Sequence, residues 1–234
     1  MRGILFDKDG TLLDFEATWT PVLRRLALEA AGGDAGKADA LLEAGGFIGR
    51  TGKFRSGSVI AAGTSASIVA LWYPGLAGDA LVRQVAAMDR AFYDHGLNHS
   101  VPIDGVLPAL ATLAAQGFVM GLATNDATAA AKAALSATGM ARYVPHVFGY
   151  DSVANAKPAP DMVHAFSRAT AIAPGDIAVV GDNAHDLEMA RHAGAGLAIG
   201  VTSGNSAAAD LAPLADAVLP SIRELPVWLA QNRK

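Results

Sequence analysis

Cysteine is absent from this chain of 234 residues. Its absence excludes a disulfide framework, thiolate metal sites and a cysteine nucleophile. Charged residues are also sparse, at 17% against 52% hydrophobic residues. The chain therefore has ample material for a buried core, and its composition is not that of a disordered protein.

Basic residues are too few for bulk nucleic-acid binding, which needs many cations on one face. Lys and Arg number 18 against 22 Asp and Glu, which gives a formal net charge of −4. No uncharged apolar run approaches the roughly 20 residues that span a bilayer. The first apolar run, residues 4–6, is too short for a secretory signal. We therefore expect a cytoplasmic protein with neither nucleic-acid nor membrane partners.

Short apolar runs without polar alternation predict buried strands. Val106, Leu110 and Leu113 have the i, i+4, i+7 spacing of a helix, and similar patterns separate most of the runs. This order predicts an α/β fold, with a Rossmann-like parallel sheet covered by helices on both faces. The expected strands are residues 4–6, 119–123, 146–149, 177–181, 197–201 and 217–219.

The segment 14–102 has a different pattern, with helical stretches and no convincing strand. We expect an α/β core of residues 1–13 and 103–234 and an inserted, all-helical cap of residues 14–102. Residues 45–63 are rich in glycine and serine and predict a mobile loop in the cap. We expect Trp19, Trp72 and Trp228 to be packing residues, because no basic stripe accompanies them. The expected cap helices are residues 18–31, 37–44, 64–72 and 79–95.

Three of the expected strands end directly in polar residues, and ligands of such sheets bind beyond the carboxyl ends of the strands. Asp7 and Asp9 follow the first strand, two residues apart. Two carboxylates at a strand tip can hold Mg²⁺, and an aspartate can carry a phosphoryl group. The same residues also fit a polar turn, with Gly10 allowing the chain to reverse.

The other polar segments each fit a phosphate site as well as an ordinary structural role. Thr124 and Asn125 begin a helix, where a hydroxyl, an amide and free N–H groups bind phosphate oxygens or simply cap the helix. Lys157 precedes Pro158 and can neutralise a phosphate from a stiff base, or lie in solvent. Asp182 and Asp186 are neighbours on one helical face. This arrangement fits a cation between the two carboxylates, or two ordinary roles at the start of a helix, Asp182 as the N-cap residue and Asp186 as a favourable charge for the helix dipole.

Taken together, these segments resemble the four signatures of the haloacid dehalogenase superfamily of hydrolases. Residues 6–12 (FDKDGTL) are similar to the first signature and Thr124-Asn125 to the second. Lys157-Pro158 is similar to the third, and Gly181-Asp182 with Asp186 to the fourth. The insertion between the first two signatures is typical of the phosphoglycolate-phosphatase-like branch.

The resemblance implies a phosphatase that uses Mg²⁺ and an aspartyl-phosphate intermediate. It makes Asp7 the nucleophile and Asp9 the general acid and base. Thr124, Asn125 and Lys157 become ligands of the phosphoryl group. The implied Mg²⁺ ligands are the carboxylates of Asp7 and Asp182, the backbone carbonyl of Asp9, and Asp186 as a ligand or a partner of one.

The expected substrate is a small phosphorylated metabolite, and the chain is expected to be a monomer or a homodimer. Two alternatives stay open, a sugar-phosphate mutase on the same scaffold and a non-catalytic phosphate-binding protein. Asp126 adds a negative charge near the phosphate site. Arg50, Lys53 and Arg55 in the cap are candidates for binding a substrate carboxylate or second phosphate, or are solvated. His185 lies inside the fourth signature, and we expect it to be exposed to solvent.

Overall fold

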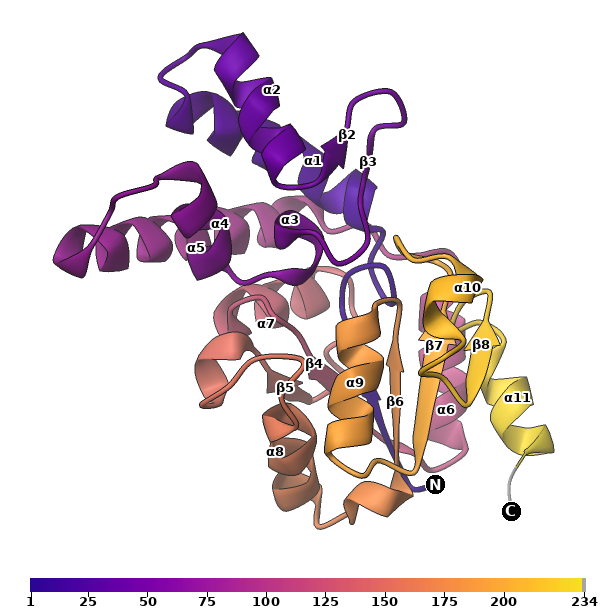
Figure 1. Cartoon of the computed structure of the whole chain (residues 1–234). Helices are drawn as coiled ribbons and strands as arrows, with labels where there is room; N and C mark the ends of the chain where they lie inside the picture. The colour runs from indigo at the N-terminus through magenta and orange to yellow at the C-terminus, as the bar shows by residue number, and fades with distance from the viewer. Residues whose placement is uncertain (233–234) are drawn as a thin grey trace.

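The sheet of this protein has six parallel strands in the order β5-β4-β1-β6-β7-β8. The computed structural model describes residues 1–232. All six expected strands are present, and the α/β fold class is confirmed (Figure 1). The strands are β1 (Gly3–Phe6), β4 (Val119–Ala123), β5 (His146–Phe148), β6 (Ile177–Gly181), β7 (Leu197–Val201) and β8 (Ala217–Leu219).

Both faces of the sheet are buried, which explains why the strands lack polar alternation. In β1, Ile4 and Phe6 enter the core beneath α6, α7 and α11. Leu5, which points to the other face, packs with residues of α8, α9 and α10. These helices are α6 (Val106–Ala115), α7 (Thr128–Ala137), α8 (Asp161–Thr170), α9 (Ala184–His192), α10 (Ala208–Leu211) and α11 (Leu225–Gln231), with short 3-10 turns at Tyr150–Ser152 and Pro174–Asp176.

Residues 14–102, between β1 and α6, form a helical layer over one end of the sheet (Figure 1). Asp14 caps its first helix by accepting a hydrogen bond from the Ala17 N–H at 2.9 Å. The layer buries an aromatic core of its own, which also takes in Ala127 and Ala130 at α7. The layer therefore packs on the sheet domain through α7. Its helices are α1 (Phe15–Ala30), α2 (Ala35–Ala44), α3 (Val59–Ala62), α4 (Ser65–Trp72) and α5 (Gly78–His99).

The expectation of no strand in this layer is wrong at one place. β2 (Phe47–Ile48) and β3 (Lys53–Phe54) form a small antiparallel hairpin. The rings of Phe47 and Phe54 lie 5.1 Å apart between centroids, and Phe54 also contacts Phe15. Strands of two residues are too short to show a period in the sequence. With α3, this hairpin gives residues 45–63 more regular structure than the expected loop.

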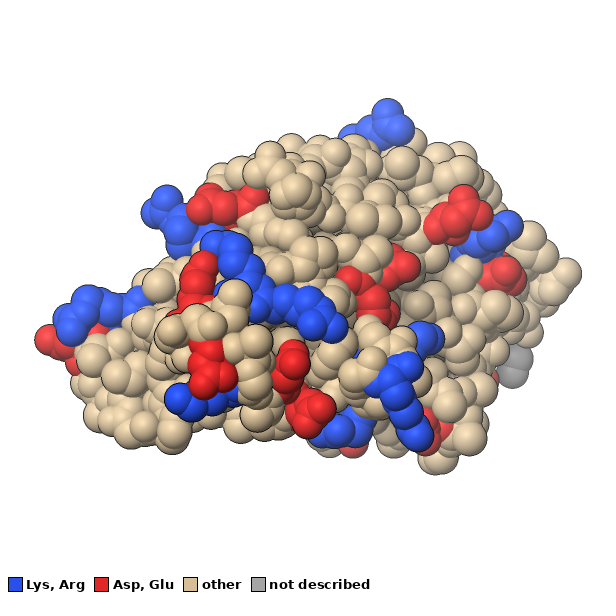
Figure 2. All heavy atoms as spheres, turned by 90° about the horizontal axis from the view of Figure 1, so that it is seen from above, with Lys and Arg blue, Asp and Glu red and all other residues tan. Residues whose placement is uncertain are grey.

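The surface agrees with the low and mixed charge of the sequence. Over the face drawn in Figure 2, basic and acidic side chains are dispersed among uncharged ones, without a continuous basic area. No helix in residues 1–232 combines the length and apolarity needed to cross a membrane.

Candidate functional site

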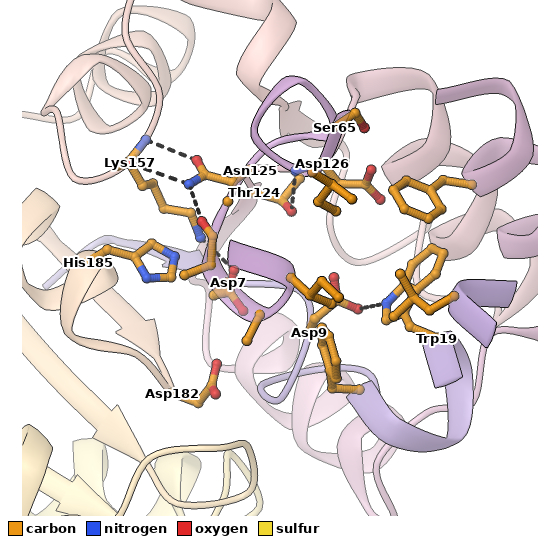
Figure 3. A pocket seen from close by; sticks show the side chains of 18 residues that line it. Asp7, Asp9, Trp19, Ser65, Thr124, Asn125, Asp126, Lys157, Asp182 and His185 are labelled. Atoms are coloured by element: carbon orange, nitrogen blue, oxygen red, sulfur yellow. Dashed lines mark hydrogen bonds and ion pairs between the residues drawn. The ribbon is translucent and has the colours of Figure 1, made fainter. Parts of the chain in front are cut away.

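A cavity lies between the carboxyl ends of the strands and the helical layer (Figure 3). Its core side is polar, and the side formed by the layer is mostly apolar. The core side comprises Asp7, Asp9, Thr124, Asn125, Asp126, Lys157, Asp182 and His185. The side formed by the layer comprises Phe15, Trp19, Leu23, Ile60, Ala61, Ala62, Gly63, Ser65, Ile68 and Phe92.

Lys157 joins two carboxylates, Asp7 after β1 and Asp186 in the first turn of α9. Its Nζ lies 2.5 Å from Asp7 Oδ1 and 2.6 Å from Asp186 Oδ1. All three side chains are buried. Burial alone would lower the pKa of Lys157, but Asp186 and Asp7 raise it above its ordinary value, so this lysine stays charged. The sequence prediction that these residues meet at one rim agrees with this geometry.

Three buried carboxylates form a potential cation site. One oxygen from each of Asp7, Asp182 and Asp186 lies within 4.8 Å of the others. Burial raises the pKa of Asp7 to about 6, and Asp186 and Asp9 add to the rise against the effect of Lys157. Burial, with Asp7 and Asp186, also raises the pKa of Asp182. One lysine thus leaves negative charge uncompensated, and carboxylate oxygens are the ligands that Mg²⁺ prefers. The donor set fits this ion.

Gly10 allows the first loop to approach Asp182 closely. Its φ of 83° lies in the left-handed region, which glycine enters without strain. A Cβ at this position would lie 2.6 Å from the carboxylate of Asp182. Asp182 is also held by the loop after β7, where its Oδ2 accepts a hydrogen bond from the Asn205 N–H at 3.0 Å. The acid is therefore fixed between two loops.

Thr124 and Asn125 both line the cavity, but only Thr124 keeps a side-chain hydrogen-bond donor available to a ligand. The Thr124 Oγ1 accepts from the Asp126 N–H at 3.1 Å, so its own proton remains available to a phosphoryl oxygen. The Asn125 amide accepts from the Lys157 N–H at 3.0 Å and donates to the carbonyls of Lys157 and Ala62. Asn125 thus fixes the Lys157 backbone and joins it to the helical layer.

Asp9 is held by a network that the sequence did not reveal. Trp19 Nε1 donates to Asp9 Oδ1 at 2.5 Å, and Lys8 Nζ lies 2.5 Å from Asp9 Oδ2. Lys8 is fully buried, 3.3 Å from Asp126 and 4.4 Å from the centroid of the Trp19 ring. Burial alone would lower the pKa of Lys8, yet Asp9 and Asp126 raise it. The Asp9 carboxylate, unlike Asp7, is not part of the cluster around Asp182.

The positions of Trp19 and His185 correct the expectations from the sequence. Trp19 belongs to the aromatic core, as expected, but its indole N–H also reaches into the site. His185 lines the cavity rather than facing solvent, and only 14% of its side chain is exposed. Burial lowers the pKa of His185 to about 3, and Lys157 lowers it further, so the ring is neutral. Its position inside the fourth signature was the one available signal.

The basic residues of the helical layer do not join the site. Arg50, Lys53 and Arg55 are exposed, and none of them lines the cavity. The Arg55 guanidinium donates to the carbonyl of Glu43 instead, at 3.2 Å. In this structure the three cations therefore lie outside the cavity lining.

Comparison with known proteins links this site to hydrolases. A family model described as haloacid dehalogenase-like hydrolase matches residues 1–194. Probable phosphatase IndB of Dickeya dadantii is 48% identical over 101 residues, 43% of each chain. The phosphoglycolate phosphatase of Escherichia coli is 36% identical over 123 residues, 51% of this chain and 48% of its own. The chain thus matches about half or less of the length of these relatives.

Solved structures share the whole architecture. A predicted phosphoglycolate phosphatase from Haemophilus somnus has a TM-score of 0.75 at 20% identity, covering 99% of this chain and 98% of that one. A phosphatase from Thermococcus onnurineus has a TM-score of 0.69 at 20% identity, with both chains covered completely. At this identity the likeness shows the fold alone.

Proposed function

Because this chain belongs to the haloacid dehalogenase-like hydrolases, we propose that it is a Mg²⁺-dependent phosphomonoester hydrolase of a small metabolite. The observation that carries the proposal is the meeting of Asp7, Lys157 and Asp182 at one end of the sheet. We propose further that residues 14–102 act as a cap over this site. A cap that excludes bulk water strengthens the interaction of the lysine with phosphate oxygens.

The proposed reaction has two steps on Asp7. In the first, the Asp7 carboxylate attacks phosphorus, the ester P–O bond breaks, and Asp9 gives a proton to the departing alcohol. In the second, Asp9 takes a proton from water, which attacks phosphorus and releases inorganic phosphate and the Asp7 carboxylate. Lys157 and the Thr124 hydroxyl hold phosphoryl oxygens. Asp7, Asp182 and the backbone carbonyl of Asp9, with Asp186 beside them, would hold Mg²⁺, which when bound would supply electrostatic stabilisation of the transferring group.

The position of Asp9 supports its acid-base role. Its side chain lines the cavity two residues after Asp7, and Lys157 lies on the other side of Asp7 (Figure 3). The leaving oxygen therefore faces Asp9 when the phosphoryl group lies against Lys157. Two donors fix the Asp9 carboxylate in this direction.

The test is phosphate release from a panel of phosphomonoesters by the wild type and the Asp7→Asn variant. We expect turnover that EDTA stops and Mg²⁺ restores, and a loss of at least about 1,000-fold in Asp7→Asn. An unchanged rate in Asp7→Asn would eliminate the mechanism. Isomerisation of a sugar phosphate without net phosphate release would favour a mutase, and phosphate binding without turnover would favour a binding protein.

A further inference from the structure

The cavity presents opposite chemistry on its two sides. Every ionisable side chain that lines it comes from the core, and the ten lining residues of residues 14–102 include none. That wall is formed by aromatic and aliphatic side chains, among them Phe15, Leu23, Ile68 and Phe92, all buried. We call these ten residues the cap wall.

Both lysines near the cavity are already engaged by carboxylates. Lys157 lies between Asp7 and Asp186, where it meets the phosphoryl group. Lys8 is fully buried behind Asp9 and Asp126 and does not line the cavity. Lys157 is held at the phosphoryl end, and the Lys8 ammonium, although 4.4 Å from the centroid of the Trp19 ring, is closed off from the cavity. A second anionic group on the substrate would thus find no cation among the described lining residues there.

We infer that the alcohol part of the substrate is uncharged and largely apolar, and that esters carrying a carboxylate or a second phosphate are poor substrates. The inference rests on the proposed function. With the phosphoryl group against Lys157 and the leaving oxygen at Asp9, the rest of the ester must lie along the cap wall. A carboxylate there would lose its hydration without gaining a counter-charge, next to the acids Asp9 and Asp126.

A cationic alcohol is disfavoured by the same geometry. The two acids that face the cap wall are already paired, since Asp9 binds Lys8 and Trp19, and Asp126 binds Lys8. Lys8 also occupies a face of the Trp19 ring, the position that a substrate ammonium group would take. One polar group is left on the wall. The buried Ser65 Oγ has no hydrogen-bond partner among the described residues and can bind one hydroxyl or carbonyl of the alcohol.

Two pairs of esters with nearly equal shape test this inference. Isobutyl phosphate and phosphoglycolate differ by an isopropyl group in place of a carboxylate. The 3,3-dimethylbutyl ester and phosphocholine differ by a carbon in place of a quaternary nitrogen. We expect kcat/KM, from phosphate release with Mg²⁺ present, to favour the uncharged member of each pair by about 100-fold or more. Because the comparison is made within each pair, the size and shape of the alcohol are matched.

A second experiment adds a positive charge to the cap wall. Ile60→Lys is expected to lower the preference for isobutyl phosphate over phosphoglycolate by about 10-fold or more. Val82→Lys adds the same charge at a site that is 67% exposed and outside the cavity, and should leave the ratio unchanged. The ratio within one preparation does not depend on the fraction of variant that folds.

The outcomes separate the inference from the proposed function. A charged member that is used as well as or better than its uncharged partner overturns the inference while phosphatase activity stands. The same holds if Ile60→Lys and Val82→Lys shift the ratio equally. If none of the esters, and no other phosphomonoester, releases phosphate, the proposed function fails and the inference fails with it.

Discussion

Trp19, in the helical layer, donates a hydrogen bond from its indole Nε1 to Oδ1 of Asp9, on the loop after β1, at 2.5 Å. This bond joins α1 of the helical layer to the residue proposed as general acid and base. The two residues are ten positions apart in the sequence, and they meet because α1 begins directly after the first loop. The helical layer therefore also orients Asp9 in this structure.

Replacing Trp19 by phenylalanine tests this coupling. Phenylalanine keeps an aromatic ring in the core but removes the donor, so Asp9 loses one of its two fixed contacts. We expect kcat to fall about 10-fold, because a hydrogen bond to a charged group contributes about 1.5–3 kcal/mol. The inhibition constant for inorganic phosphate should change little, since Lys157 and Thr124 are untouched. Steady-state kinetics with phosphate as a product inhibitor measures both.

Trp72→Phe is the matched control. Trp72 is as buried as Trp19, and its Nε1 donates to the Leu41 carbonyl at 3.1 Å, away from the cavity. Its loss should reduce stability without lowering kcat. Equal falls in kcat for both variants would show that Trp19 acts only through packing.

The buried Lys8 is expected to be a major determinant of stability. Lys8→Met leaves Asp9 and Asp126 without their cation in a buried place, and breaking such a pair costs about 3 kcal/mol or more. Lys8→Met combined with Asp126→Asn removes one of the two stranded charges. We therefore expect the double variant to be more stable than Lys8→Met. Urea unfolding in EDTA measures the difference, and a double variant that is no more stable than Lys8→Met would contradict this account.

The strands and their polar ends could be predicted from local sequence. The central strands β1 and β6 are buried on both faces, so a run such as residues 177–181 is apolar throughout and then ends at Asp182. The same rule placed Asp7 and Thr124 at one edge. Lys157 is predicted with them only from the resemblance, because its place before Pro158 also fits a lysine in solvent, and the structure places its Nζ against Asp7.

The network around Asp9 could not be predicted in this way. Lys8 stands between two aspartates, a pattern that fits a solvated turn as well as a buried lysine. Its burial depends on Trp19 from α1 and on Asp126 from the loop after β4, which the chain brings together only in three dimensions. The position of Arg50 outside the cavity likewise depends on the hairpin β2–β3. The strands of this hairpin have two residues each and show no period in the sequence.

Mg²⁺ is expected to stabilise the protein more at neutral than at acidic pH. Burial raises the pKa of Asp7 from its ordinary 3.8 to about 6. The folded state therefore holds this proton more tightly than the unfolded state, and the resulting stability is lost as the pH rises through about 6. Mg²⁺ binds the deprotonated carboxylates and offsets that loss. The rise in Tm on adding Mg²⁺ should be larger near pH 7.5 than near pH 5.

Two variants serve as controls for the metal experiment. Asp182→Asn removes a proposed ligand and should abolish the rise in Tm. Asp104→Asn changes a side chain that is 94% exposed and should leave the rise intact. A rise of equal size near pH 5 and near pH 7.5 would show that Mg²⁺ does not act through Asp7.

The neutral ring of His185 is expected to make the protein sensitive to acid. Burial lowers the pKa of His185 from 6.5 to about 3, with a further contribution from Lys157. Between these two values the unfolded chain binds a proton that the folded chain does not, so stability falls as the pH drops below 6.5. His185→Gln removes this proton uptake. Between about pH 7 and pH 5 the wild type should lose up to about 2 kcal/mol more unfolding free energy than the variant. Both proteins keep Asp7, so its opposite contribution cancels in the comparison.

Urea unfolding in EDTA gives the two losses, and an NMR titration of the His185 ring gives the pKa directly. Equal losses, together with a ring that titrates near 6.5, would show that the imidazole is solvated and does not face the carboxylate cluster.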